Sequence, residues 1–287
     1  MITTTAPTTV VAHRLVGARN SLTNAVTGTA FDGETYSRMK FGDARALRNL
    51  GADLGEALVS AVPHLVADDA PPVLPVAYLA VPPACYYLAT AVLHVLDAHR
   101  AVTGLAPGRI TRIHKDSVTR TDYATASAAD RAAELSRIGF TLTEDLTGCH
   151  VVVVDDVRVT GLAETAVLGA LADSRPRSVT LGYVATVEDP VLQADPSVES
   201  AMNHHTIRTV MDMIPAIEEE NFHLTIRFLK QALAVDAGDR RRLFDACPTA
   251  LLNDMLAGAR ASGTVFVQGY APGISALEQA VRERGPQ

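Results

Sequence analysis

The stretch of sequence that decides the fold is Val-Val-Val-Val-Asp-Asp-Val-Arg-Val-Thr-Gly-Leu-Ala, residues 151–163. Four β-branched residues in a row are typical of a strand that is covered on both faces, as in a parallel sheet. Apolar residues at helical spacing follow and predict a helix over residues 164–173. We therefore expect a strand, a loop and a helix, with Asp155 and Asp156 at the carboxyl end of the strand.

The acidic pair at this position indicates a binding site. Two neighbouring carboxylates at the end of a buried strand repel each other and lose hydration, so they need water, a cation or the hydroxyl groups of a polyol. Thr160 and Gly161 follow at the expected helix start, where backbone N–H groups favour a phosphate. The stretch therefore predicts a sugar-phosphate site. The alternative is an ordinary strand-to-helix turn capped by acidic residues.

Residues 151–163 resemble the PRPP-binding signature of the type I phosphoribosyltransferases, where PRPP is 5-phosphoribosyl 1-pyrophosphate. That signature consists of four apolar residues, an acidic pair, small or apolar positions, and Thr-Gly. The resemblance implies that Asp155 and Asp156 hold the ribose hydroxyls and a Mg²⁺ ion, the metal through water. It also implies a loop for the 5′-phosphate, made of Val157, Arg158, Val159, Thr160, Gly161, Leu162 and Ala163.

Three positions of this loop depart from the signature. Arg158 stands where the family usually has an aliphatic residue, and Val159 and Ala163 stand where hydroxyl groups are frequent. Backbone amides would therefore supply more of the phosphate contacts than usual. No GxxxxGK[ST] motif occurs in the chain, and no GxGxxG motif follows a predicted strand.

The composition is that of a compact protein. The chain has 287 residues, 48% of them hydrophobic and 20% charged, with a net charge of −7 and no long basic run, which argues against nucleic acid as a partner. Three distant cysteines match neither a disulfide framework nor a zinc site, and we see no secretory signal, so we expect a reduced cytoplasm. The apolar region 71–96 contains five prolines, so we expect no membrane span.

Predicted strands and helices alternate through the first two thirds of the chain. Helices are expected at 44–62, 88–98 and 130–138, and further strands at 73–81, 110–114 and 178–187. This alternation predicts an α/β fold with a doubly wound, mainly parallel sheet. The first dozen residues are expected to be frayed.

After residue 190 the pattern changes to a mainly helical region. Helices are expected over 202–217, 218–233 and 240–260, with a strand at 264–267. We therefore divide the chain into an N-terminal extension (1–35), a phosphoribosyltransferase-like core (36–190) and a helical region (191–287) that covers the site and binds the acceptor.

Two further segments carry pyrophosphate candidates because of the resemblance. The loop 81–86 would offer the backbone amides of Ala84, Cys85 and Tyr86, although a rigid proline turn without a ligand is the alternative. We interpret Cys85 as a small buried residue and not as a nucleophile. The polar segment 109–124 suits a mobile lid that closes over PRPP and brings cations to the pyrophosphate. Lys115 and Arg120 are the first candidates, and Arg112 and Tyr123 are the next. An ordinary surface loop is the alternative.

Residues 36–43 carry a third candidate. An alternating strand there would place Arg38 and Lys40 on one face, where both could meet a phosphate, although an edge strand with outward charges explains the pattern equally well. Asp43 is a plausible helix N-cap.

Several charged or ligating groups have simpler explanations. His204, His205 and His223 lack the spacing of a metal site, and Arg240–Arg242 is interpreted as a surface cluster. Glu218–Glu220 is interpreted as a hydrated helix start, with a docking patch for an amine as the alternative.

The resemblance implies an enzyme that transfers the 5-phosphoribosyl group of PRPP to a small-molecule acceptor and releases pyrophosphate, with Mg²⁺ as cofactor. We expect a polar or amine-rich acceptor, such as an aminocyclitol in a biosynthetic pathway. A nucleobase phosphoribosyltransferase, a PRPP sensor without turnover, and a hydrolase or lyase of ribosyl phosphates are the alternatives. The partners are expected to be small molecules only, and a homodimer is possible since the family often dimerises.

Overall fold

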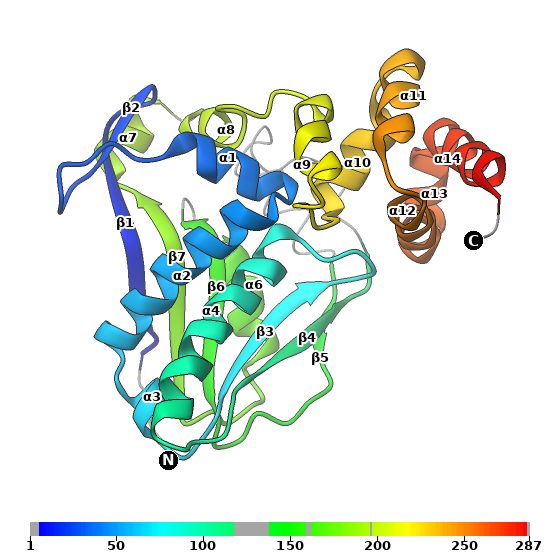
Figure 1. Cartoon of the computed structure of the whole chain (residues 1–287). Coiled ribbons are helices and arrows are strands. Elements are labelled where there is room, and N and C mark those ends of the chain that lie inside the picture. The colour runs from blue at the N-terminus through cyan, green and yellow to red at the C-terminus, as the bar shows by residue number, and fades with distance from the viewer. Residues whose placement is uncertain (1–5, 118–137, 159–161, 196, 286–287) are drawn as a thin grey trace.

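The computed structural model describes residues 6–117, 138–158, 162–195 and 197–285, without the side chains of Leu162, Ala163 and Ala194. The described residues form a seven-stranded sheet in the order β2-β1-β7-β6-β3-β4-β5 (Figure 1). The five inner strands run parallel and the two edge strands antiparallel, which confirms the predicted mainly parallel sheet. The strands are β1 (Thr8–Ala18), β2 (Ser21–Asn24), β3 (Pro72–Tyr78), β4 (Arg109–Lys115), β5 (Phe140–Leu142), β6 (His150–Arg158) and β7 (Ser178–Val187).

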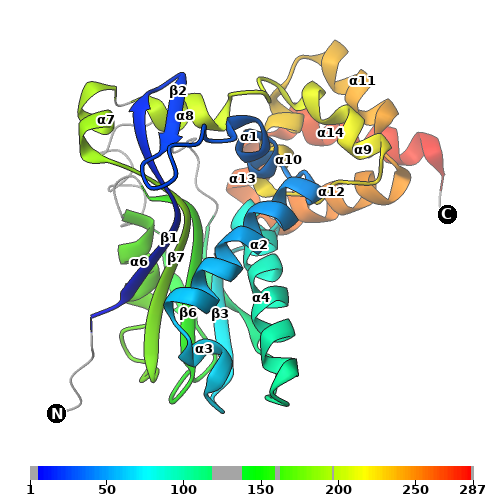
Figure 2. The same cartoon turned by 60° about the vertical axis from the view of Figure 1, so that its left-hand side comes forward.

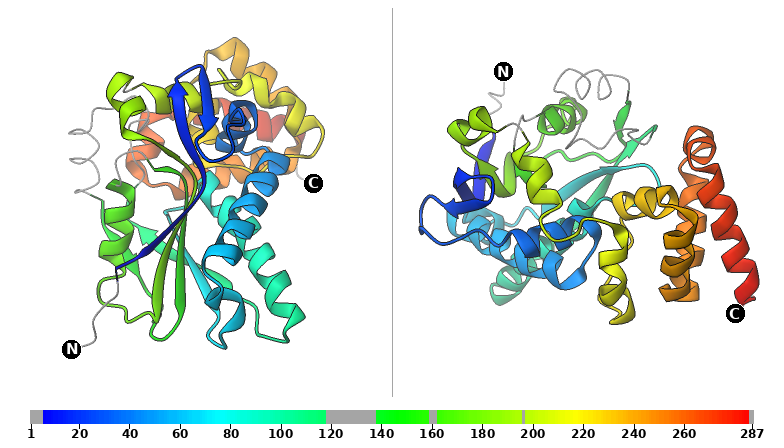
Figure 3. Two further views of the ribbon diagram at one scale, coloured as in Figure 1. Left: turned by 90° about the vertical axis from the view of Figure 1, so that its left-hand side faces the viewer. Right: turned by 90° about the horizontal axis from the view of Figure 1, so that it is seen from above.

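Helices cover both faces of the sheet. Figure 2 shows α2, α3 and α4 on one face and α6 on the other, and the left view of Figure 3 shows the same three layers. The Asp43 side chain caps α2 by accepting hydrogen bonds from the Arg45 and Ala46 amides, as the sequence predicts. These helices are α2 (Ala44–Ala61), α3 (His64–Ala67), α4 (Ala84–Val102) and α6 (Leu162–Ala170).

The four valines of β6 explain the layered core. Val152 and Val154 pack in one hydrophobic cluster with residues of α2 and α4, whereas Val151 and Val153 pack in another cluster with Leu171 and its neighbours on the α6 side. All four are at most 7% exposed. Because successive side chains of a strand point to opposite faces, a strand between two helical layers has to be apolar throughout.

Most of the helical region after residue 190 has a core of its own, whereas Val191 of α7 and Val198 and Met202 of α8 pack in the core of the sheet. The core of the helical region also takes in Phe41 from α1 (Gly33–Phe41) and Val81 from the loop after β3, both of which precede the region in sequence. The right view of Figure 3 shows these helices beside the carboxyl ends of the strands. They are α7 (Asp189–Ala194), α8 (Val198–Asn203), η1 (Val210–Met213), α9 (Ile214–Glu218), α10 (Ile226–Ala234), α11 (Ala237–Ala246), α12 (Thr249–Ala261), α13 (Thr264–Gly269) and α14 (Ala271–Arg284).

Several sequence-based expectations of secondary structure are wrong. Residues 8–18 are not frayed, because β1 pairs along β7 and buries Val10 and Leu15. Residues 36–41 lie in a helix, which the Asp32 side chain caps at the Thr35 amide and Gly42 ends in the left-handed conformation (φ 105°). Residues 264–267 lie in α13. Glu218 is the last residue of α9, so Glu218–Glu220 end a helix instead of starting one, and residues 204–209 interrupt the helix expected over 202–217.

Other expectations stay predictions. The expected helix at 130–138 lies, except for its last residue, outside the described residues. The division at residues 35 and 190 is also a prediction, although β1 and β2 share the sheet of the core. No helix among the described residues is both long and apolar enough to cross a membrane.

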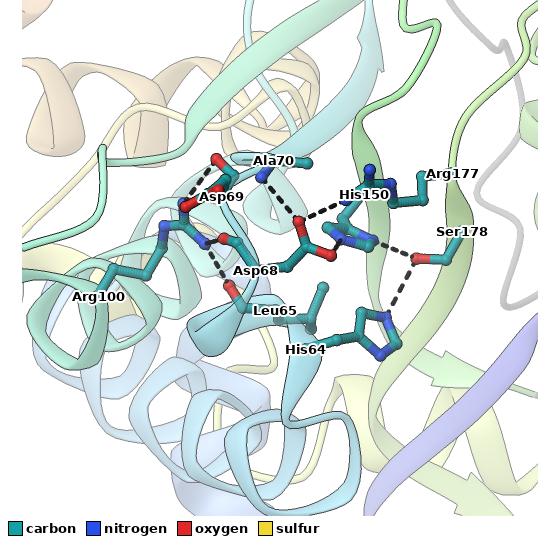
Figure 4. A network of polar contacts seen from close by, with 9 residues as sticks. All are labelled: His64, Leu65, Asp68, Asp69, Ala70, Arg100, His150, Arg177 and Ser178. Atoms are coloured by element: carbon teal, nitrogen blue, oxygen red, sulfur yellow. Dashed lines mark hydrogen bonds and ion pairs between the residues drawn. The ribbon is translucent and has the colours of Figure 1, made fainter. Parts of the chain in front are cut away.

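A buried arginine ties the amino-terminal edge of the sheet together. Arg100 of α4 is 0% exposed and donates to the backbone carbonyls of Leu65 (2.8 Å), Asp68 (3.0 Å) and Asp69 (3.5 Å) (Figure 4). It also donates to the Ala106 carbonyl (2.6 Å). Its planar guanidinium can serve several acceptors at once. Arg100 therefore fixes the chain between α3 and β3.

Two histidines complete this network. The His150 and His64 rings lie 4.6 Å apart, and the Ser178 hydroxyl lies 2.7 Å from His150 Nδ1 and 3.2 Å from His64 Nε2. The Asp68 carboxylate lies 3.5 Å from His150 Nε2 and forms an ion pair with Arg177 (Figure 4). The first residues of β6 and β7 are thus joined to the segment before β3.

Candidate active site

A cavity of about 430 Å³ lies at the carboxyl ends of β3, β4 and β6, between the sheet and α10. Open α/β sheets bind ligands at this edge of their parallel strands. The acidic residues among those that line the cavity are Asp155, Asp156 and Glu164, and the basic ones are Lys40, Lys115, Arg227 and Lys230. The predicted acidic pair therefore faces a ligand-sized space.

Asp156 is held by groups from α1 and from its own strand. Lys40 Nζ lies 2.5 Å from Asp156 Oδ2, and both side chains are nearly buried, at 10% and 13% exposed. The Tyr36 hydroxyl donates to Asp156 Oδ1 at 3.4 Å, and the Val157 amide donates to the same oxygen at 2.6 Å. Burial and the Asp156 charge raise the pKa of Tyr36, so its hydroxyl stays protonated and can donate.

The surroundings of Asp155 favour the protonated form of its carboxyl group. Burial and the neighbouring Asp156 charge raise the pKa of Asp155 to about 7, against the opposing effect of Lys40. The Asp156 amide donates to Asp155 Oδ1 at 2.9 Å. A cation or hydroxyl donors would stabilise the ionised form of this carboxyl group. These are the partners that the sequence predicts for the pair.

Arg158, the unusual residue of the signature, is held outside the cavity lining. Its Nε donates to Glu164 Oε2 at 2.9 Å, and the Tyr183 hydroxyl donates to the same oxygen at 2.6 Å. Burial and this hydrogen bond raise the pKa of Tyr183. The contacts link Arg158, which lies at the end of β6 and within the predicted phosphate loop, to the first turn of α6. Val159, Thr160 and Gly161 lie outside the described residues.

The loop after β3 contributes Ala84 and Cys85 to the cavity, at the start of the 19-residue helix α4. Amides in the first helical turn have no partner within the helix and favour an anion. Tyr86 does not line the cavity: its amide donates to the Pro83 carbonyl at 3.0 Å, and its ring contacts Tyr78 at 5.6 Å. Burial raises the pKa of the Cys85 thiol, and the charges of Asp155 and Asp156 add to the effect, so Cys85 does not have the character of a nucleophile.

The predicted cations separate into two groups. Lys115 and Lys40 line the cavity. Arg112 lies over the Tyr78 ring (4.6 Å) and donates to the Tyr78 carbonyl, and Arg38 pairs with Asp43 at 2.8 Å, so neither lines the cavity. Arg120 and Tyr123 lie outside the described residues.

Sequence reasoning expected the helical region to cover the site but missed the side chains that this region places in the cavity. Arg227, Lys230 and Gln231 of α10 and Tyr270 line the cavity. A signal was present in the composition, because the chain has 22 arginines but only three lysines, Lys40, Lys115 and Lys230. All three line the cavity.

The site has the donor set of a magnesium ion that shares its ligands with a substrate. The described residues contain no group of three or more His, Cys, Asp or Glu side chains that could hold a metal. Mg²⁺ usually binds through one or two carboxylates, with water and substrate phosphates as its other ligands. Asp155 and Asp156, which line the cavity together with cationic side chains, fit this requirement.

A family profile described as PRTase ComF-like matches residues 19–269. The chain belongs to this family. The match spans β2 to α13, so it includes every strand of the sheet except β1, the acidic pair and most of the helical region. The type I phosphoribosyltransferase resemblance and the fold class read from the sequence are thereby confirmed. No curated protein matches this chain.

Solved structures to which this chain is similar include hypoxanthine phosphoribosyltransferases. The enzyme of Trypanosoma cruzi in complex with the product IMP is 14% identical, with a TM-score of 0.35, over 52% of this chain and 83% of the other. The hypoxanthine-guanine enzyme of L. donovani is 12% identical, with a TM-score of 0.32, over 50% and 70%. The Staphylococcus aureus enzyme is 12% identical, with a TM-score of 0.32, over 50% and 73%.

Proposed function

We propose that this protein transfers the 5-phosphoribosyl group of PRPP to a small-molecule acceptor, with Mg²⁺, and releases pyrophosphate. The family match and the position of the acidic pair support this proposal. The observation that carries it is that Asp155 and Asp156 line a cavity at the carboxyl end of β6, beside Lys115 and the first amides of α4.

Several groups in the cavity would have a role in this reaction. Asp155 and Asp156 would accept hydrogen bonds from the ribose hydroxyls and would hold Mg²⁺ through water, and the ion would neutralise negative charge on the pyrophosphate. Lys115 and the amides of Ala84 and Cys85 would stabilise the charge that grows on the departing pyrophosphate. The acceptor would approach C1 from the opposite side, held by the helical region.

Calorimetry and mass spectrometry test this proposal together. Mg²⁺ and PRPP should bind to the wild-type protein and not to the Asp155→Asn/Asp156→Asn variant, whose fold is checked by circular dichroism. Incubation with amine, hydroxyl and ring-nitrogen acceptors should add one ribose phosphate to one class of them. Absence of PRPP binding to the wild-type protein would exclude the proposal.

A PRPP sensor without turnover is the second candidate, and the Lys40 contact favours it. Asp156 already has an ammonium group 2.5 Å away, and two prolines stand in the pyrophosphate loop, so the site could bind PRPP and still lack the groups that turnover needs. A sensor would bind Mg²⁺ and PRPP with the affinity of an enzyme, yet would release no pyrophosphate with any acceptor. An aminocyclitol acceptor, a cytoplasmic location and a homodimer stay predictions from the sequence.

A further inference from the structure

The charges that line the cavity are distributed unevenly. Asp155 and Asp156 come from β6, and Glu164, which comes from α6, accepts hydrogen bonds from Arg158 and Tyr183. The charged residues that the helical region contributes to the lining are cationic, Arg227 and Lys230. Four cations face three carboxylates in the lining, although the whole chain carries a net charge of −7.

The two pairs of cations come from different elements of the fold: Lys40 and Lys115 from α1 and β4, and Arg227 and Lys230 from α10. The charges of Lys40 and Lys115 both act on the Cys85 thiol, against the acidic pair, so these lysines lie around the sheet end of the cavity. Arg227 lies 5.8 Å from the Phe41 ring and acts on the Tyr36 hydroxyl. Lys230 is one helical turn further along α10.

Arg227, Lys230 and Gln231 lie three and four residues apart, so they share one face of α10. Around them the cavity wall is apolar, with Ile226, Ala234 and the Tyr270 ring. Guanidinium, ammonium and amide groups are hydrogen-bond donors that match a carboxylate or a phosphate. An apolar wall beside them suits a ring or another apolar body.

We propose that Arg227 and Lys230 bind an anionic group of the acceptor, so that the acceptor is a small carboxylate- or phosphate-bearing molecule with an apolar or aromatic body. This inference rests on the proposed function. It differs from the amine-rich acceptor expected from the acidic composition, because the composition describes the whole surface and the cavity has the opposite balance.

Because the chain has three lysines and all three line the cavity, NMR signals from labelled lysines report on ligand binding there. Reductive methylation with ¹³C-formaldehyde labels every lysine and keeps its charge. The protein then gives an NMR signal for each of Lys40, Lys115 and Lys230, besides that of the N-terminal amine, and single Lys→Arg variants assign them. Mg²⁺ and PRPP alone should shift the Lys115 signal. If no lysine signal moves with Mg²⁺ and PRPP, the proposed function fails, whatever the acceptor probes show.

Matched probes then separate anionic from neutral acceptors on the PRPP-loaded protein. The pairs are pyridine-3-carboxylate with pyridine-3-carboxamide and phenyl phosphate with phenol, so the two arms also distinguish a carboxylate from a phosphate. The anionic member of at least one pair should shift the Lys230 signal, and the neutral members should not. Equal shifts within both pairs, or no shift of Lys230 with any probe, would overturn the inference while PRPP binding stands.

Substitutions make the assignment specific. Arg227→Gln/Lys230→Gln should weaken binding of the anionic probe by roughly tenfold to a hundredfold, measured by calorimetry, because hydrogen bonds to charged groups are lost. Lys230→Arg should retain most of the affinity, and Arg241→Gln, on the exposed face of α11, should retain all of it. A tenfold loss of PRPP affinity in the double variant would assign these cations to the pyrophosphate and overturn the inference.

Discussion

Lys40 Nζ lies 2.5 Å from Asp156 Oδ2, so a residue of α1 holds one of the two acids at the end of β6, more than a hundred positions away in the sequence. The contact also explains how an acidic pair is tolerated at this depth. The ammonium group offsets one carboxylate, and the Asp155 pKa rises to about 7 for the other.

We expect Lys40→Met to lower the free energy of unfolding by about 3 kcal/mol, because it leaves a nearly buried carboxylate without its cation. Urea denaturation at pH 8 measures this loss. Combining it with Asp156→Asn in a double-mutant cycle isolates the interaction, and the double variant should lose less than the sum of the two single variants. Strict additivity would show that the ion pair does not stabilise the fold.

The affinity for Mg²⁺ and PRPP should rise as the pH rises through about 7, because the ionised form of Asp155 is the one that binds a cation. Calorimetry from pH 6 to 8 measures this dependence. The Asp155→Asn variant is the control, since PRPP itself titrates. A wild-type profile that parallels that of the variant would contradict the role of Asp155.

The same group has the opposite effect on stability. Between about pH 4 and 7 the folded chain keeps the Asp155 proton that the unfolded chain has released, so the free energy of unfolding falls as the pH rises across this window. We therefore expect Asp155→Asn to stabilise the protein by about 1 to 3 kcal/mol at pH 8 and to have little effect at pH 4. Thermal unfolding at the two values measures the difference.

The histidine network should make the protein sensitive to acid. Burial lowers the pKa of His150, and the neighbouring His64 adds to the effect, while Asp68 acts in the opposite direction. Between this lowered value and 6.5 the unfolded chain binds more protons, so stability is lost as the pH falls below about 6.5. His150→Gln should flatten the dependence of Tm on pH between 5 and 7. His94→Gln, at an exposed position of α4, should leave it unchanged.

Arg100→Met should lower the free energy of unfolding by about 3 kcal/mol or more, because four backbone carbonyls lose their donor at a buried position. Arg100→Lys should recover only part of this loss, since an ammonium group cannot reach acceptors spread around a planar fork. Urea denaturation compares both with Arg45→Met, at an exposed position of α2. An unchanged PRPP affinity in the folded variants would show that the Arg100 network, at the amino ends of the strands, does not influence the candidate site at their carboxyl ends.

The sequence was sufficient for the parts of the molecule that local patterns specify. The valine run predicted β6, although the strand continues past the acidic pair to Arg158, and helical spacing predicted α2. β1 was missed because its stability comes from pairing with β7, which no local pattern reveals. Helix α1 was missed because its polar sequence has little periodicity, although Asp32 and Gly42 mark its two ends.

The candidate site was also predictable only where local sequence motifs mark it. Its acidic pair, Lys40 and Lys115 were named from the sequence, but Lys40 was assigned to the pyrophosphate and the structure places it on Asp156. The α10 wall depends on how the helical region packs over the strands, which the order of the elements does not specify. The scarcity of lysine was the signal in the sequence that could have identified Lys230.

Phe41 and Val81 lie in the core of the helical region, although each belongs to a segment that borders the cavity on the sheet side. A chimaera that exchanged residues 191–287 for those of a relative would therefore set a foreign core against both residues and disturb α1 and the loop after β3. We therefore expect changes in residues 191–287 to affect the binding of both the acceptor and PRPP. Homologues with a different helical core should carry compensating substitutions at positions 41 and 81.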